Sequence, residues 1–487
     1  MIPLIDLSHL RRYDLALEEG GRVVDVIDEV GFRVASFVRS TMGPVYGKRI
    51  LVLMGKGNNG ADALAAARYL RQFGASVEEA RFNWSDAPYS GTDYDLIIDG
   101  VFGTGISRGL QGKVIEASGA KIVSIDIPSG VDLDRVVQDE NCVNADVTLI
   151  IGALKVGQLN RGTVELMGEA YLWCFDDLNE AKGDQGLFEV SDIVFRGESL
   201  SEHKWKRAVH VVAGSQTTIG ASLLAGEAAL HSGAGLVRVS GNFERPDLLQ
   251  AAHPGLLVGD EKSFERDIST LSRYGAVVIG PGLGELSGQL LEQVLVNFAG
   301  PLVIDADAIS AISQSDLLKE LLKKYKYPVL LTPHDGEVTR LFTSVGLDLS
   351  DASFKSFVSD FGVDLLHKGF PTRIFTSDRR IVYVTSNSSN LSVAGSGDVL
   401  SGMIGAFIAR NGYSVETVAS ATYIHGLSGG RSVTNPISMI DSVAGLIEAI
   451  PKFRTNAVKL SGGFRPIVSR GPLTSVTDSK LQWSYRW

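Results

Sequence analysis

Short apolar runs, most of them followed by a stretch with helical spacing, are the feature that most restricts how this chain can fold. In the first half the runs cover residues 50–54, 96–98, 122–125 and 147–151. In the second half the candidate strands cover residues 208–213, 276–279, 302–304, 329–332, 364–367 and 379–384. Strands that are apolar on both faces and alternate with helices are typical of a mostly parallel sheet covered by helices. The sequence therefore predicts an α/β protein.

The length of 487 residues exceeds what one hydrophobic core usually contains and predicts two domains. A polar, irregular stretch near residues 176–207 separates the two groups of apolar runs. We therefore expect one domain at residues 1–190, a second at 191–453, and a tail at 454–487. From Lys452 to Arg486 the chain has seven basic residues against one acid. The tail could be disordered or could pack on a neighbouring subunit.

Charge and composition exclude several classes of partner. The net charge is -10, so the chain offers no general attraction for nucleic acid or for an anionic membrane surface. No apolar run reaches the roughly 20 residues that span a bilayer. The two cysteines, Cys142 and Cys174, match no metal-binding spacing and are expected to be small buried apolar side chains. These features predict a cytoplasmic protein without membrane or nucleic-acid partners.

Three loops that follow strands in the first half contain chemically useful residues. The run 50–54 leads into a glycine-rich turn, 55–62, which contains Asn58 and Asn59; Asp99 and Asp126 follow two other strands. Backbone N–H groups of such a turn can bind an anion, and amide oxygens can hold a cation or a hydroxyl group. Each loop alone also fits an ordinary turn or helix cap. Together they favour a ligand site, because ligands collect at the carboxyl ends of parallel strands.

The order and spacing of Gly57-Asn-Asn-Gly60 with Asp62, of 99–105 and of 126–130 resemble the N-terminal domain of the bifunctional NAD(P)H-hydrate repair enzymes. The resemblance implies a Rossmann-like three-layer domain that interconverts the R and S epimers of NADHX and NADPHX. It implies a potassium ion held by Asn59, Asp99 and Ser129, and Asp126 as catalytic acid/base. The dinucleotide would contact Asn58, Asn59, Gly60, Ala61, Asp62, Asp126, Gly103, Thr104, Gly105, Ile106, Ser107, Arg108 and Gly109.

The chain departs from that family pattern at a few positions. Ala61 and Ala63 stand where the family usually has glycine, and the segment 27–31 reads Ile-Asp-Glu-Val-Gly in place of Met-Glu-Asn-Ala-Gly. A methyl group can interfere where backbone must approach a phosphate. The alternative of a non-catalytic dinucleotide-binding module therefore stays open for this domain.

In the second half the segment Ala394-Gly-Ser-Gly-Asp398 precedes a helix expected at 403–410. Small residues before an aspartate at a helix start leave backbone N–H groups free to hold a transferring phosphoryl group. The carboxylate of Asp398 can accept the proton of an attacking hydroxyl. Further polar loops follow strands at 280–284, 305–307 and 332–337, and each of these alone also fits turn chemistry.

Together these loops resemble the ribokinase-like domain of the ADP- or ATP-dependent NAD(P)H-hydrate dehydratases, with Asp398 as the catalytic residue. The resemblance implies dehydration of S-NAD(P)HX with ADP, or ATP, as phosphoryl donor, Mg²⁺ as cofactor, and a homo-oligomer. The substrate would contact Ala221, Gly282, Gly284, His334 and Asp398. The adenine nucleotide would contact Lys368, Gly369, Phe370, Pro371, Thr372, Gly395, Ser396 and Gly397. A small-molecule kinase on the same fold is the alternative.

Overall fold

The computed structural model describes residues 1–41, 43–104, 110–116, 119–175, 178, 183–197, 203–260, 264, 268–386, 389–431, 435–455 and 464–468. The chain forms two compact units. The N-terminal unit contains residues 2–185 and the strand at 465–468, and the C-terminal unit contains Met1 and the described residues from 186 to 455. Both units are built on mostly parallel sheets with helices, so the predicted α/β class is confirmed.

The sheet of the N-terminal unit has the strand order β21-β10-β8-β7-β5-β2-β3. Its strands are β2 (Arg49–Met54), β3 (Ser76–Arg81), β5 (Leu96–Gly100), β7 (Lys121–Ile125), β8 (Val147–Gly152), β10 (Glu169–Cys174) and β21 (Arg465–Val468). All neighbours are parallel except β10 and β21. A piece of the tail therefore adds an edge strand to this unit, an arrangement that the sequence did not indicate.

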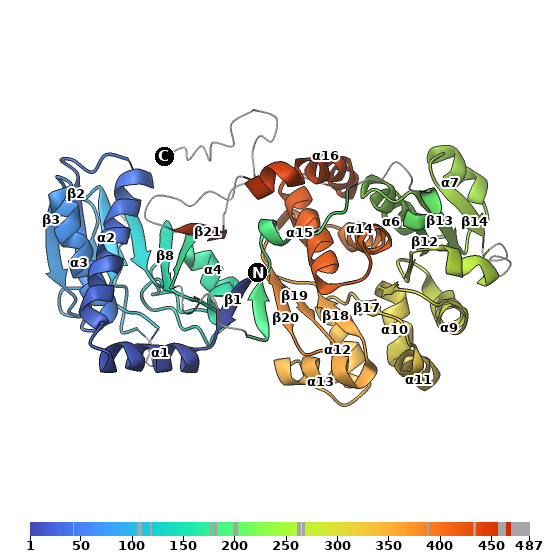
Figure 1. The fold of residues 1–487 in the computed structure, drawn as a ribbon, viewed down its shortest axis with the longest axis horizontal. Coiled ribbons are helices and arrows are strands. Elements are labelled where there is room, and N and C mark those ends of the chain that lie inside the picture. The colour runs from blue at the N-terminus through green and yellow to red at the C-terminus, as the bar shows by residue number, and fades with distance from the viewer. Residues whose placement is uncertain are drawn as a thin grey trace. The chain divides into compact units, whose positions relative to one another are not determined.

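Helices cover one face of this sheet. α2 (Val23–Thr41) and α3 (Asn58–Gln72) lie side by side, and α3 packs on β2, β3 and β5 (Figure 1). The other face carries an apolar cluster with the two-stranded ribbon of β4 (Tyr89–Ser90) and β6 (Ile115–Glu116). The unit also contains β1 (Ile2–Ile5), α1 (Leu7–Glu19), β9 (Leu154–Lys155), η1 (Val156–Leu159) and α4 (Arg161–Met167), and β1 pairs with β9.

The sheet of the C-terminal unit has the order β14-β13-β12-β15-β16-β17-β18-β19-β20 and is parallel from β14 to β18. The strands that the sequence predicts are β12 (Ala208–Val212), β15 (Ala276–Ile279), β16 (Leu302–Ile304), β17 (Val329–Leu331), β18 (Asp364–His367) and β20 (Ile381–Val384). The sequence missed β13 (Leu236–Gly241), β14 (Leu257–Asp260) and β19 (Thr372–Phe375). Arginines interrupt the apolar pattern of β13 and β19, which weakens their signal.

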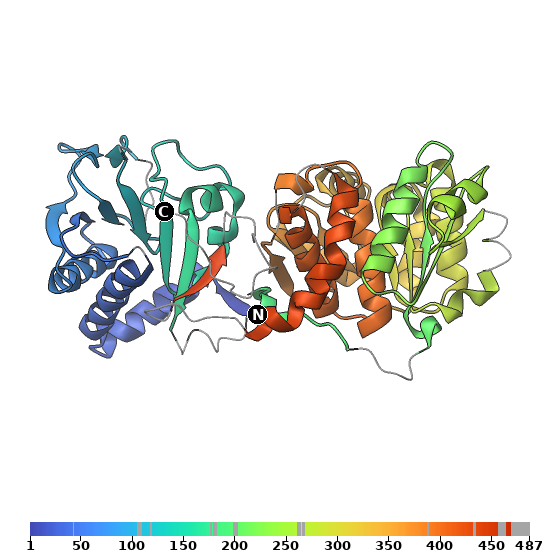
Figure 2. The same ribbon diagram turned by 90° about the horizontal axis from the view of Figure 1, so that it is seen from above.

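Two groups of helices enclose this sheet. α6 (Ile219–His231), α14 (Ser396–Asn411), α15 (Val415–Arg431) and α16 (Pro436–Thr455) form one layer (Figure 2). α9 (Ser287–Asn297), α10 (Ala306–Gln314), α11 (Asp316–Lys324), α12 (Asp335–Thr343) and α13 (Asp351–Phe361) form the other, while α7 (Pro246–Ala252) packs beside β14. α14 begins seven residues before the expected helix at 403–410, so Asp398 lies inside its first turn.

Candidate functional site

A buried carboxylate lies among the strand ends of the N-terminal unit. Asp99, in β5, is fully buried, and both of its oxygens accept hydrogen bonds. Oδ1 accepts from the Ser129 hydroxyl at 2.5 Å, and Oδ2 accepts from the Ser124 hydroxyl at 2.8 Å and the Ser129 backbone N–H at 2.9 Å. Burial raises the pKa of Asp99. Among the ion pairs of the described residues, none involves Asp99, so its charge has no cationic side chain beside it.

Asn59 lies in the first turn of α3, close to this carboxylate. Its side-chain nitrogen donates to the Phe102 carbonyl at 3.0 Å, whereas its amide oxygen is buried without a hydrogen-bond partner. The Phe102 backbone N–H donates to the Ser129 hydroxyl at 2.9 Å, which connects Asn59 to Asp99 through two residues. The structure thus brings the three predicted potassium ligands together. The Asn59 amide oxygen is buried without a hydrogen-bond donor, and the nearby Asp99 carboxylate has no cationic side chain beside it. These two ligands fit a cation of low charge density.

Asp126, directly after β7, is held by an ion pair that the sequence analysis missed. The Lys155 ammonium lies 2.5 Å from Asp126 Oδ1, and Lys155 is only 1% exposed. The Gln158 side chain donates to the Asp126 carbonyl at 2.9 Å and accepts from the Lys155 backbone N–H at 2.9 Å. Asp126 has a φ of +65°, a strained conformation for a residue with a side chain. Lys155 could have been found, because it comes shortly after the apolar run 147–151, as Asp126 comes directly after the run 122–125.

Asp62, in α3, interacts electrostatically with Asp126 and with Asp14. Burial, and then repulsion by Asp126 and by Asp14 of α1, raises the pKa of Asp62 to about 8. Asp14 and Asp126 thus both interact with the buried Lys155, and both repel a charge on Asp62.

The other predicted dinucleotide contacts of this unit differ in their exposure, and some of them lie outside the described residues. Asn58 is exposed at the start of α3, Ala61 is partly exposed, and Gly60 is buried where a Cβ would come within 2.2 Å of the Gly55 carbonyl oxygen. Gly103 and Thr104 follow β5 and are partly exposed. Gly105, Ile106, Ser107, Arg108 and Gly109 lie outside the described residues.

Ala63, one of the two departures from the family pattern, is fully buried. A Cβ built on Gly100 would come within 2.5 Å of its methyl group. The Ala63 methyl therefore packs against β5 and does not interfere with a ligand above the turn.

Asp398 occupies the first turn of α14 in the C-terminal unit. The turn is entered through Gly395, whose φ of +88° is a left-handed conformation that favours glycine. Burial, followed by repulsion from Asp305, raises the pKa of Asp398 to about 7, with smaller contributions from Asp307 and Glu337, while Lys368 opposes the shift. A carboxyl group that titrates near neutral pH can accept and release a proton under physiological conditions.

Lys368 provides the positive charge of this group. Its ammonium lies 2.7 Å from Asp305 Oδ1, and a Cβ built on Gly397 would lie 3.3 Å from the same nitrogen. Burial alone would lower the pKa of Lys368, but Asp305 and then Glu337 outweigh it and raise the pKa. Asp305, 1% exposed, also accepts hydrogen bonds from the Ala306 backbone N–H and the Ser401 hydroxyl. The sequence analysis did not assign this network.

The predicted substrate contacts of this unit lie in neighbouring loops. The Gly284 backbone N–H donates to Asp307 at 2.8 Å, and a Cβ on Gly282 would lie 2.9 Å from the Ala221 Cβ. His334 caps the N-terminus of α12, is 56% exposed, and lies 3.5 Å from Glu337. Asp307 and Glu337, which belong to these loops, interact electrostatically with Asp398.

The predicted nucleotide contacts range from exposed to buried. Gly395 and Gly397 are partly exposed around the start of α14, whereas Ser396 is buried and lies 3.3 Å from His425. Gly369 is exposed, and Phe370 and Pro371 are partly exposed. Thr372 lies in β19, is 4% exposed, and donates its hydroxyl to the Gly369 carbonyl. Thr372 therefore stabilises the loop 369–371 through this hydrogen bond.

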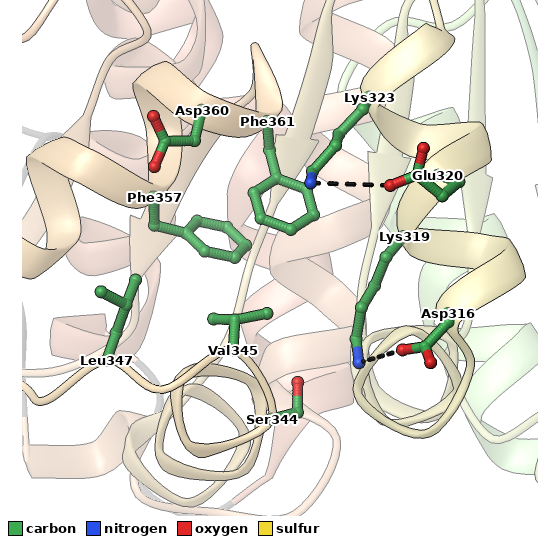
Figure 3. Close-up of a pocket in the computed structure, with 10 residues that line it drawn as sticks. All are labelled: Asp316, Lys319, Glu320, Lys323, Ser344, Val345, Leu347, Phe357, Asp360 and Phe361. Carbon is green, nitrogen blue, oxygen red and sulfur yellow. Dashed lines mark hydrogen bonds and ion pairs between the residues drawn. The ribbon is translucent and has the colours of Figure 1, made fainter.

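A hollow of about 370 Å³ lies away from both groups, between α11 and α13 (Figure 3). Phe357 and Phe361 line it, and its two lysines are paired with acids on their own helix, Lys319 with Asp316 and Lys323 with Glu320. It contains none of the predicted site residues. Among the described residues, no group of three or more His, Cys, Asp or Glu side chains is arranged to hold a metal ion.

Two mostly parallel sheets, each with a carboxylate and a glycine-rich helix start near the carboxyl ends of its strands, define the class of α/β proteins that bind ligands at this edge of the sheet. Comparison with known proteins makes this specific. A family model described as NAD(P)H-hydrate dehydratase matches residues 209–452, and one described as YjeF-related protein N-terminus matches 25–88 and 78–157. The chain belongs to the family of bifunctional NAD(P)H-hydrate repair enzymes.

Two relatives carry the name bifunctional NAD(P)H-hydrate repair enzyme Nnr. The one from Escherichia coli is 30% identical over 77% of this chain and 79% of its own length. The one from Dictyoglomus turgidum is 28% identical over 87% of this chain and 93% of its own length. A solved ribokinase-like superfamily protein from Enterococcus faecalis is 24% identical with a TM-score of 0.49, covering 56% of this chain and 98% of that chain.

No helix among the described residues combines the length and apolar character needed to cross a membrane. The cytoplasmic location and the homo-oligomer stay predictions.

Proposed function

We propose that the C-terminal unit dehydrates the S epimers of NADHX and NADPHX at the expense of ADP or ATP, with Asp398 as the catalytic base. The observation that carries this proposal is the placement of Asp398 in the first turn of α14, with its pKa raised to about 7 and Lys368 beside the adjacent backbone. A base that titrates near neutral pH, next to N–H groups that can hold a phosphoryl group, suits transfer of phosphate to a hydroxyl.

The reaction balances in two steps. Asp398 takes the proton of the hydroxyl on the hydrated ring, and that oxygen attacks the terminal phosphorus of the donor, whose bond to the leaving nucleotide breaks. In the second step the lone pair of the ring nitrogen expels phosphate, and the neighbouring ring carbon loses a proton to form the double bond of NADH or NADPH. The backbone N–H groups of Gly395 and Gly397 and the Lys368 ammonium would stabilise the charge on the moving phosphoryl group, whereas the Ser396 N–H donates to the Val393 carbonyl.

Magnesium fits the charges of this site. Asp305, Glu337 and Asp398 all interact electrostatically with Lys368, and Asp307 adds a further negative charge near Asp398. The acids therefore outnumber the lysine where an anionic donor must bind. Mg²⁺ is usually held by one or two carboxylates together with substrate phosphates, so it does not need a preformed cluster of three acids. Bound there, it would neutralise the donor phosphates. Asp305 is engaged by Lys368 and Ser401 on both oxygens, whereas Asp307 and Glu337 each accept one backbone N–H, from Gly284 and His334, and would hold the ion through their remaining lone pairs.

For the N-terminal unit we propose epimerisation of R- and S-NAD(P)HX, with Asp126 as the group that moves the proton. The unpartnered oxygen of Asn59 and the buried charge of Asp99 would hold a potassium ion with Ser129. Such an ion would supply a fixed positive charge beside the substrate loops. The glycine-rich start of α3 would bind the pyrophosphate of the dinucleotide.

Recovery of the absorbance of NADH from purified S-NADHX tests the first activity, with ADP and ATP compared as donors. The same assay from R-NADHX tests the second, because an active epimerase converts the R form faster than its spontaneous rate. No recovery from S-NADHX with either donor would contradict the dehydratase proposal. Release of a stable phosphorylated product would favour the small-molecule kinase alternative.

A further inference from the structure

A buried histidine lies behind the start of α14. His425, in α15, is 5% exposed, and its Nε2 lies 3.0 Å from the Ser396 carbonyl oxygen and 3.3 Å from the Ser396 hydroxyl. A carbonyl oxygen can only accept a hydrogen bond, so Nε2 carries the proton and donates it. Ser396 is also 5% exposed. The contact is therefore inside the unit, where His425 is not accessible to a bound ligand.

The imidazole of His425 is neutral at neutral pH. Burial lowers its pKa to about 4, the hydrogen bond to the Ser396 backbone opposes that shift, and the charge of Lys368 adds to it. A neutral imidazole has one N–H, and here the Ser396 carbonyl accepts it. His425 therefore adds no charge to the site and acts on it through the backbone of Ser396.

The hydrogen bond from His425 acts on the peptide group between Ser396 and Gly397. A trans peptide is planar, and its C=O and N–H point in opposite directions. Because the Ser396 carbonyl points at His425, the Gly397 N–H points away from it. This N–H belongs to the first turn of α14, where backbone N–H groups have no partner within the helix. A Cβ built on Gly397 would lie 3.3 Å from the Lys368 ammonium nitrogen, so the glycine lies beside the lysine of the proposed phosphoryl site.

The backbone at this point needs an external support. Glycine lies on both sides of Ser396, and Gly395 has a φ of +88°. Glycine restricts the backbone less than any other residue, so a peptide beside it rotates more readily. A donor fixed on a second helix limits that rotation. α15 is closely packed near His425, because a Cβ built on Gly426 would overlap the Ser386 hydroxyl.

We propose that His425 is a positioning residue of the dehydratase, whose N–H holds the Ser396 carbonyl so that the Gly397 N–H points at the phosphoryl group in transfer. This inference rests on the proposed dehydratase function. Donors already oriented toward the charge of a transition state stabilise it without reorganisation. His425 should therefore affect the chemical step more than the binding of S-NADHX.

Two neutral amides separate the hydrogen bond from the presence of a buried polar side chain. In His425→Gln the side-chain amide can take the place of Nε2, whereas in His425→Asn it reaches only the place of Nδ1. Both variants are measured as full-length protein with purified S-NADHX, Mg²⁺ and ADP or ATP. We expect His425→Asn to lose about 10-fold or more in kcat, because the peptide is no longer held, with KM for S-NADHX changed less than about 3-fold. His425→Gln should retain at least about a third of the wild-type kcat.

His210→Gln is the matched control. His210 is also a buried histidine, and its Nε2 lies 2.9 Å from the Ser240 hydroxyl. It lies in β12, where Val209 and Val211 on either side of it belong to the core cluster that includes residues of α14. Successive side chains of a strand point to opposite faces of the sheet, so His210 points away from α14. His210→Gln should lower the melting temperature and leave kcat unchanged.

The comparison of the two amides decides the inference. An equal fall in kcat in His425→Asn and His425→Gln would overturn it, as would a wild-type kcat in His425→Asn. Failure of either variant to fold, measured by thermal melting, would also overturn it, since His425 would then serve folding. A wild type that restores no NADH from S-NADHX with either donor would instead overturn the dehydratase proposal, and this inference with it.

Discussion

The Lys368 ammonium lies 2.7 Å from Oδ1 of Asp305, and the Ser401 hydroxyl hydrogen-bonds the other oxygen of the same carboxylate. Lys368 follows β18, Asp305 precedes α10, and Ser401 belongs to α14. The pair therefore fixes a positive charge beside the start of the helix that bears Asp398. Three segments far apart in sequence meet where the proposed phosphoryl transfer takes place.

Asp398→Asn should reduce the dehydration of S-NADHX at least about 100-fold, because the amide cannot accept the hydroxyl proton. The rate of NADH recovery at saturating donor measures this loss. Asp316→Asn, at a position whose side chain is 99% exposed on α11, is the control and should retain full activity. Retention of more than a tenth of the wild-type rate in Asp398→Asn would remove Asp398 from the catalytic role.

The pH dependence of dehydration should follow Asp398. Its pKa is raised to about 7, so the base becomes ionised, and the rate should rise, as the pH increases from 6 to 8. Stability has the opposite sign: the protonated form is favoured in the folded protein, so this contribution is present below pH 4 and is lost as the pH rises through about 7. Asp398→Asn should therefore melt at a higher temperature than the wild type at pH 8. A lower melting temperature at pH 8 would contradict this burial argument.

Asp305→Asn should remove the ion pair that positions the Lys368 ammonium, while the lysine itself remains. We expect kcat for dehydration to fall about 10-fold or more, because the Lys368 ammonium is no longer fixed where it would stabilise the moving phosphoryl group. KM for S-NADHX should change little. Steady-state kinetics with ADP and with ATP separate the two constants. Asp351→Asn, which breaks the exposed Asp351–Arg373 pair, should leave both unchanged.

Potassium should stabilise the N-terminal unit through Asp99. A ligand at one hundred times its Kd adds about 2.7 kcal/mol to folding, so thermal unfolding should shift upward in KCl relative to tetramethylammonium chloride at equal ionic strength. Asp99→Asn should abolish most of that difference, because the buried charge that attracts the cation is gone. Equal melting temperatures of the wild type in the two salts would argue against a potassium site.

The packing of α14 on α6 can be tested at Gly402. A Cβ at this position would come within 2.0 Å of the Ala225 carbonyl oxygen, so Gly402→Ala should destabilise the C-terminal unit by about 1–3 kcal/mol. Denaturant unfolding measures the change. Gly445→Ala, in α16, has open space around the new methyl group and should be neutral or slightly stabilising. Similar stabilities of the two variants would show that α14 can shift away from α6.

The apolar strands and the loops that follow them were predictable because continuous apolar runs and glycine-rich turns are local patterns. Strands with a charged residue, such as β13 with Arg238, escaped prediction because their pattern is weaker. β21 could not be predicted, since a strand that pairs with β10 from the tail depends on a contact across nearly three hundred residues.

The sequence by itself determined that Asp126 follows an apolar strand and that Asp398 follows a glycine-rich segment before a helix, and from this the class of enzyme and its family resemblance followed. Only the tertiary structure decided which charges surround them. Lys155 and Lys368 lie close to Asp126 and Asp305 because parallel strands bring their carboxyl ends to one edge, and burial there strengthens each charge interaction. Protonation states depend on such neighbours in space, and therefore the raised pKa values of Asp62 and Asp398 could not be inferred from residue order.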